Sequence, residues 1–193
     1  MYKTSITPEE INKLPVKSFE GEIILIDNLH RLYEAVDFLK TQTILGFDTE
    51  TKPSFRKGSR NSNTVALLQF STSAKAFLFR LNIIGLPESL ISILSNGNIL
   101  KIGAAIRDDI KVLQKLRAFT PSGFIDIQQY IKNFGIENTG VKKLAAIILK
   151  IKISKSQQLS NWESPALSDS QMRYAATDAW VCGEIFRKIT GFV

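Results

Sequence analysis

The sequence predicts an α/β fold in which helices pack on a mixed β-sheet. Three consecutive extended segments, residues 43–51, 65–72 and 76–81, are apolar and are separated by polar residues, which indicates an antiparallel meander. Helical and extended periods then alternate over residues 87–152, as they do in β-α-β units. A meander followed by such units implies strands of both orientations in one sheet that is covered by helices.

The predicted elements follow one another along the chain. Residues 22–26 are apolar and β-branched, and Asp27 or Asn28 is suited to cap a helix over residues 29–40. After the meander we expect helices at 87–94 and 107–117, strands at 99–104 and 124–127, helices to about residue 152, a last helix at 168–190, and surface loops at 52–63 and 154–166.

The composition indicates one compact domain that does not span a membrane. The chain has 193 residues, of which 44% are hydrophobic and 22% charged, and it lacks the run of roughly 20 apolar residues that a membrane span requires. Residues 1–14 contain acidic and polar side chains where a secretory signal has an apolar run. We therefore expect a cytoplasmic protein.

The single cysteine and the single histidine restrict the metal chemistry. Cys182 cannot form an internal disulfide, and it lies too far from His30 in the sequence for a zinc site of the two. A metal would need oxygen ligands, which favours Mg²⁺ or Mn²⁺. The formal net charge of +7 and the isoelectric point near 9.5 suit an anionic partner such as nucleic acid.

The first candidate site segment is residues 46–51, Gly-Phe-Asp-Thr-Glu-Thr, where a buried strand ends in acids. Asp48 and Glu50 are two positions apart and therefore share one face of the strand. Two carboxylates on a half-buried face repel each other unless they share a cation, so the pair predicts a metal site. Two solvated acids at the end of a strand are the alternative.

The second segment carries two adjacent acids on a predicted helix. Asp109 is in register with Ile106 and Leu113 on the apolar stripe, whereas Asp108 shares its face with Lys111. A buried acid needs a partner, so Asp109 is the candidate ligand and Asp108 is expected to face solvent or to cap the helix.

The third segment lies on the last helix, where Tyr174 and Asp178 are four residues apart and therefore neighbours. Their face continues through Val181, Cys182 and Ile185, so Asp178 also points toward the core. Three separate segments thus each supply an inward carboxylate, and one oxygen-ligated metal site accounts for all three.

These three segments resemble the exonuclease motifs of the DEDDy family of 3'-5' exonucleases, which includes ribonuclease D and the Werner-syndrome-type exonuclease domain. The resemblance covers the chain from about Glu22 onward, so we expect an N-terminal extension at 1–20 and an exonuclease domain at 21–193. The position five residues before the last acid, where a related subgroup has histidine, is Arg173, which favours the tyrosine subgroup. The resemblance implies a ribonuclease-H-like fold with a mixed five-stranded sheet flanked by helices.

The same resemblance implies catalysis with two Mg²⁺ or Mn²⁺ ions. Asp48 would bridge both ions, Glu50 and Asp178 would complete one site, and Asp109 would hold the other ion, through water. Tyr174 would orient the attacking water, and Glu50 would contact the terminal 3'-hydroxyl. The ions would activate that water and neutralise the leaving 3'-oxygen.

A basic loop follows the first acidic segment. Lys52, Arg56, Lys57 and Arg60 are placed to bind phosphates, and Thr49 is a further candidate nucleic-acid contact. A solvated loop is the alternative for the basic residues.

Other polar and aromatic residues are interpreted as structural. The five lysines between residues 142 and 155 receive no role, because amphipathic helices carry such lysines on their solvent face. Trp162 and Gln69 are expected to support packing.

The expected partner is single-stranded or 3'-ended DNA, and the expected reaction is hydrolysis from the 3' end. The chain shows no additional domain for binding tRNA, which favours DNA over ribonuclease D-like trimming of RNA. RNA trimming remains one alternative, and a catalytically silent nucleic-acid-binding module is another. The sequence defines no oligomeric state and is compatible with a monomer.

Overall fold

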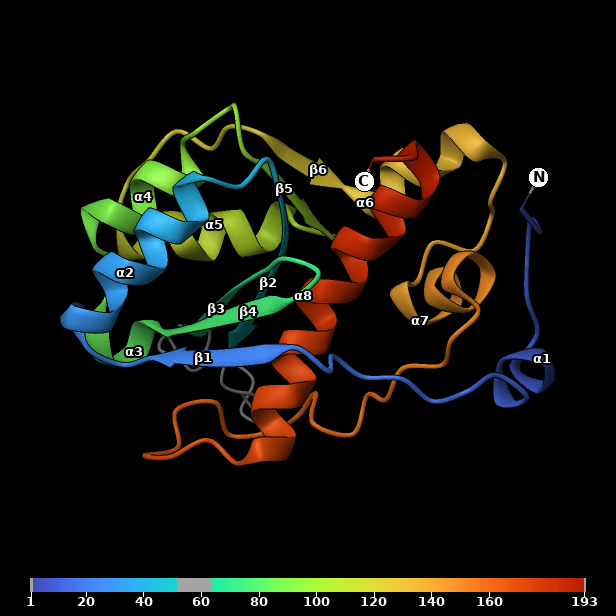
Figure 1. Ribbon diagram of the computed structural model, residues 1–193, viewed down its shortest axis with the longest axis horizontal. Coiled ribbons are helices and arrows are strands. Elements are labelled where there is room, and N and C mark those ends of the chain that lie inside the picture. The colour runs from blue at the N-terminus through green and yellow to red at the C-terminus, as the bar shows by residue number, and fades with distance from the viewer. Residues whose placement is uncertain (1, 52–63, 193) are drawn as a thin grey trace, which may run out of the picture.

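The computed structural model describes residues 2–51 and 64–192 of the chain (Figure 1). Within these two ranges, no helix is long and apolar enough to cross a membrane.

A mixed sheet of six strands forms the centre of the molecule, in the order β1-β4-β3-β2-β5-β6. The strands are β1 (Glu22–Ile26), β2 (Ile44–Thr51), β3 (Val65–Ser71), β4 (Lys75–Arg80), β5 (Leu100–Gly103) and β6 (Phe124–Asp126). The pairs β2–β3 and β3–β4 are antiparallel, so the predicted meander is confirmed. The pairs β1–β4, β2–β5 and β5–β6 are parallel.

The expected number of five strands is wrong. A short strand completes each edge of the four-stranded centre, β1 with five residues and β6 with three, and this raises the number to six. The mixed α/β architecture itself is as predicted.

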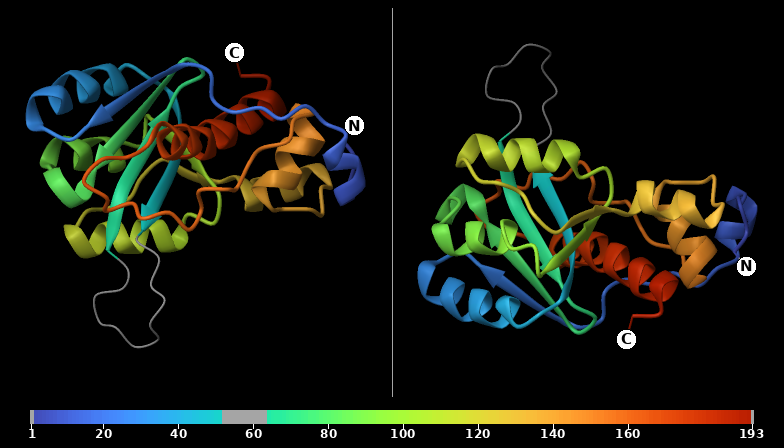
Figure 2. Two further views of the ribbon diagram at one scale, coloured as in Figure 1. Left: turned by 90° about the horizontal axis from the view of Figure 1, so that it is seen from below. Right: turned by 90° about the horizontal axis from the view of Figure 1, so that it is seen from above.

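Helices cover both faces of the sheet. The helical segments are α1 (Pro8–Asn12), α2 (Leu29–Lys40), α3 (Leu81–Ile84), α4 (Glu88–Leu94), α5 (Arg107–Leu116), α6 (Ile127–Tyr130), a 3-10 turn (Ile131–Phe134), α7 (Val141–Leu144), a π turn (Ala145–Leu149) and α8 (Asp169–Thr190). Figures 1 and 2 show α2, α4 and α5 on one side of the sheet, while α8 crosses the other.

The central strand β2 serves both layers because its side chains alternate. Leu45 and Phe47 pack into the cluster formed with α2, α4 and α5, whereas Ile44 packs into the cluster formed with α8. The acids that follow at positions 48 and 50 therefore point toward α8.

Capping residues define both ends of helix α8. Ser168 and Gln171 form a capping box at its start, and Gly191 ends it in the left-handed conformation with φ of 69°. The helix has 22 residues, so one element carries buried residues along the whole sheet.

The described part of the predicted N-terminal extension packs on α8. The Phe19 side chain is buried, its backbone N–H donates to Thr177 Oγ1 at 2.9 Å, and its carbonyl accepts from Arg173 at 2.8 Å. Val16 forms a parallel bridge with Lys152. The predicted boundary at residue 20 stays a prediction, but Phe19, just before it, forms hydrogen bonds with the last helix.

Candidate active site

Strand β2 places two carboxylates under α8. Asp48 and Glu50 lie on the same face, as the two-residue spacing predicts, and Glu50 is only 9% exposed. The strand is central: it pairs with β3 on one side, where Asp48 lies opposite Gln69, and with β5 on the other through residues before the acids. The strand that carries the acids therefore lies inside the sheet and not at its edge.

A close approach of β2 and α8 brings the third carboxylate to this pair. Gly46 lies directly against the Ala179 carbonyl group, and a Cβ at position 46 would overlap with that backbone. Gly183, one turn further along α8, also packs on Gly46. Asp178 precedes Ala179, so this contact between backbones sets its distance from Asp48.

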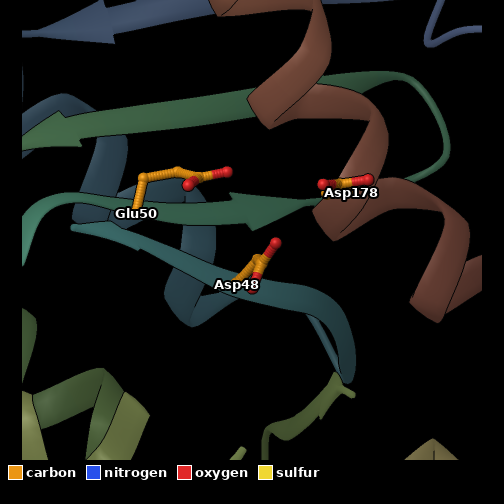
Figure 3. Close-up of side chains that lie close together, drawn as sticks. All are labelled: Asp48, Glu50 and Asp178. Atoms are coloured by element: carbon orange, nitrogen blue, oxygen red, sulfur yellow. The ribbon is translucent and has the colours of Figure 1, made fainter. Parts of the chain in front are cut away.

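The three carboxylates converge, as Figure 3 shows. One oxygen from each of Asp48, Glu50 and Asp178 lies within 4.8 Å of the others. Asp178 is 5% exposed, and its side chain is held on a helix rather than on a loop. Three acids so close together need protons or cations to offset their charges.

Burial and mutual repulsion disfavour the charged forms of the acids. Burial raises the pKa of Asp48 well above its ordinary value, and the charges of Asp178 and Asp109 add to this effect. Burial, followed by the charge of Asp48, raises the pKa of Glu50 from 4.5 to about 9. Without a bound metal ion, Glu50 therefore favours its protonated form at neutral pH.

Asp109 approaches from the opposite face of β2. It is half-buried and accepts a hydrogen bond from the Thr49 hydroxyl, whereas Asp108 is exposed and bonds to Lys111 at 3.0 Å. The predicted inward and outward orientations are thus confirmed. Burial raises the pKa of Asp109, and the Thr49 hydrogen bond opposes that shift.

Asp109 does not belong to the group of three whose oxygens converge, but its charge acts on Asp48 and Glu50. Thr49 is 8% exposed, and the contact that its side chain makes is with Asp109. The roles of Asp109 as a ligand and of Thr49 as a nucleic-acid contact stay predictions.

Tyr174 lies one turn before Asp178 on α8. Burial, followed by the charge of Asp178, raises the pKa of Tyr174 far above 10. Trp162, fully buried despite its place in a predicted surface loop, packs on the Tyr174 ring with the ring centroids 6.0 Å apart. The predicted packing role of Trp162 is therefore confirmed, and Trp162 helps to fix the phenol.

Lys155 is a member of the site that sequence reasoning missed. Its Nζ lies 2.8 Å from both carboxylate oxygens of Asp178 and 5.4 Å from the centroid of the Tyr174 ring. The motifs carry no signal for it, because the loop after residue 152 returns to α8 from 23 residues away. The interpretation of Lys155 as a solvent-facing lysine without a role is therefore wrong.

The predicted phosphate-binding residues Lys52, Arg56, Lys57 and Arg60 lie outside the described residues. Gln69 is fully buried, as a structural role requires, but neither of its side-chain polar atoms has a hydrogen-bond partner within the described part of the chain.

The fold and the carboxylate cluster together define a nuclease of the ribonuclease-H-like class. A family model described as 3'-5' exonuclease matches residues 23–192, and the chain belongs to this family. The resemblance found in the motifs is thereby confirmed, and the chain is a 3'-5' exonuclease domain.

Individual relatives agree with this assignment. The chain is 28% identical to the exonuclease mut-7 homolog of Aedes aegypti, over 88% of this chain and 27% of that protein. The crystal structure of the Aedes aegypti Nibbler EXO domain superposes with a TM-score of 0.80 at 25% identity, covering 91% of this chain and 92% of that one.

A second solved structure shares the fold at lower identity. It is Trypanosoma brucei RNase D in complex with RNA U12, with a TM-score of 0.78, 19% identity, and coverage of 90% of this chain and 64% of that one. The chain spans less than half the length of the curated relatives it matches.

Proposed function

We propose that this exonuclease domain removes nucleotides from a nucleic-acid 3' end with two Mg²⁺ or Mn²⁺ ions. The observation that carries the proposal is the convergence of Asp48, Glu50 and Asp178 within 4.8 Å, in a largely buried site. Such oxygen donors suit hard divalent cations, and the raised pKa values of Asp48 and Glu50 mean that a cation would relieve an existing repulsion.

The residues that would hold the ions are Asp48, Glu50 and Asp178, with Asp109 on the far face of β2. When bound, the ions would lower the pKa of the attacking water and stabilise negative charge on the leaving 3'-oxygen. Binding also requires the carboxylates to lose the protons that burial favours. Metal affinity should therefore increase with pH.

Tyr174 acts in this proposal as a positioning group. Because its pKa is raised, the phenol keeps its proton at neutral pH and cannot serve as a general base on its own. Its hydroxyl can donate one hydrogen bond and accept another, so it can hold a water molecule beside Asp178. The packing of Trp162 on its ring restricts where that water would lie.

We also propose which polymer the domain cleaves. We take a single-stranded or recessed DNA 3' end as the first substrate and RNA as the alternative. The Trypanosoma brucei RNase D structure contains RNA U12, which supports testing both polymers side by side. Discrimination would depend on contacts to the 2'-hydroxyl.

A time course on 5'-labelled DNA and RNA of one sequence tests this proposal. With Mg²⁺ or Mn²⁺, we expect a ladder that shortens by one nucleotide from the 3' end, and no cleavage with chelator. The Asp48→Asn variant serves as the control for contaminating nucleases. If neither polymer is cut, as single strands or as recessed duplexes, the chain would be a silent binding module.

A further inference from the structure

The ion pair between Lys155 and Asp178 occupies the centre of the candidate active site. The Lys155 ammonium lies at equal distances of 2.8 Å from both oxygens of Asp178. The Asp178 side chain is 6% exposed, whereas that of Lys155 is 36% exposed. The pair therefore joins a fixed buried anion to a cation that reaches in from the surface.

The charge of Lys155 acts on the whole cluster and not on Asp178 alone. It lowers the pKa of Asp48 and of Glu50, against the larger effect of burial. Within residues 2–51 and 64–192, no other lysine or arginine forms an ion pair with these three acids. Lys155 is thus the counter-ion that the described part of the chain supplies to the cluster.

A divalent ion bound by Asp178 would use the oxygens that Lys155 now contacts. An ammonium and a divalent cation at neighbouring positions repel each other, so both cannot be held tightly by one carboxylate. Resting on the proposed metal-dependent function, we propose that Lys155 competes with the metal for Asp178. Metal binding then requires the ammonium to leave, and Lys155 sets the metal concentration at which the site fills.

The structure also indicates which partner moves. Asp178 is on α8, whose backbone packs directly on β2 at Gly46. Lys155 lies three residues after Lys152, which pairs with Val16, and is at the start of a loop. A lysine side chain has a flexible stem of four carbons and is readily hydrated. Displacement of the ammonium into solvent therefore leaves the carboxylates in place.

Lys155→Met tests the competition because it keeps the length of the side chain and removes the charge. The Mn²⁺ dissociation constant is measured without nucleic acid, by electron paramagnetic resonance of free Mn²⁺, and the Tm is measured with chelator. We expect the variant to bind Mn²⁺ at least about 5-fold more tightly, the low end of typical coupling between sites. We also expect a lower Tm with chelator, because Asp178 loses its counter-ion.

Two further variants test whether a change in Mn²⁺ affinity depends on the charge at position 155. Lys152→Met removes a nearby lysine that bonds to Asn12 at 2.8 Å, outside the site, and should leave Mn²⁺ affinity unchanged. Lys155→Arg keeps the charge and offers a two-pronged contact to the carboxylate, so it should weaken Mn²⁺ binding. This variant retains the ion pair, so it also provides a test if the methionine variant fails to fold.

The possible outcomes separate this proposal from the proposed function. Unchanged or weaker Mn²⁺ binding by Lys155→Met, with a wild-type protein that binds the ion, would overturn the competition and leave the metal site intact. Failure of the wild type and all variants to bind Mn²⁺ would overturn both proposals.

Discussion

The contact between Gly46 and α8 predicts that one substitution can inactivate the site although every proposed metal ligand is kept. In the Gly46→Ala variant, the new Cβ would lie 2.7 Å from the carbonyl carbon of Ala179, where ordinary contact starts at 3.4 Å. The strand and helix must therefore separate by at least 3.4 − 2.7, or about 0.7 Å. Neither backbone can rotate away as a side chain would.

The expected cost follows from this overlap. Overpacking of a well-packed interior destabilises by about 1–3 kcal/mol, and the smaller entropy of the unfolded alanine chain returns about 0.4–1 kcal/mol. We expect a net loss of about 1 kcal/mol, measured by urea unfolding with chelator. The shift of Asp178 away from Asp48 should also reduce exonuclease activity by about 100-fold, since a displacement near 1 Å has effects of this size.

Gly140→Ala is the matched control, because Gly140 has φ of −64° and no atom lies within 4 Å of a Cβ placed there. This variant should retain wild-type stability and activity. Wild-type stability and activity in Gly46→Ala would refute the idea that this contact sets the spacing of the carboxylates.

Three further predictions concern single acids. Asp48→Asn should abolish turnover and Mn²⁺ binding while the chelator-treated protein remains folded, because it removes a ligand and also a repulsive charge. Asp109→Asn should lower activity strongly and Asp108→Asn should not, since Asp109 is half-buried beside Thr49 and Asp108 is exposed. The metal-free protein should lose stability as pH rises from about 5 through about 9, because the folded state raises the pKa of Glu50 from 4.5 to about 9 and binds the proton that the unfolded chain releases.

For each of these three predictions, one measured result would contradict it. Residual turnover by Asp48→Asn above the level of a mock preparation would contradict the site. Equal activities of the Asp108 and Asp109 variants would contradict the orientation argument. For the pH effect, Glu50→Gln should flatten the fall in stability, whereas Glu20→Gln, whose side chain is 71% exposed, should not. A metal-free wild type with stability independent of pH would count against a protonated Glu50.

Local patterns predicted most of the elements. The helix over Leu29–Lys40 was predicted with its bounds, because Asn28 caps it with a side-chain hydrogen bond and its apolar residues recur at helical spacing. The short helix α1 was not predicted, although Thr7 and Glu10 form a capping box that the sequence displays.

Contacts between distant segments were much less accessible from the sequence. The motif residues could be assigned to faces of β2, α5 and α8 because a face depends only on local periodicity. The interaction of Lys155 with Asp178 could not be found in this way, since it depends on the path of a loop without periodicity. The packing role of Trp162 was predicted from its residue type, but its contact with Tyr174 also depends on the path of this loop.

The alternation of β2 also restricts how this protein can change over evolution. Thr49 meets Asp109 on one face, and Asp48 and Glu50 meet Asp178 on the other. Deletion or insertion of one residue between Gly46 and Glu50 would exchange the two faces of the segment that follows it. Homologous sequences can therefore diverge widely in composition, but an altered length of this short segment should be among the changes that selection removes first.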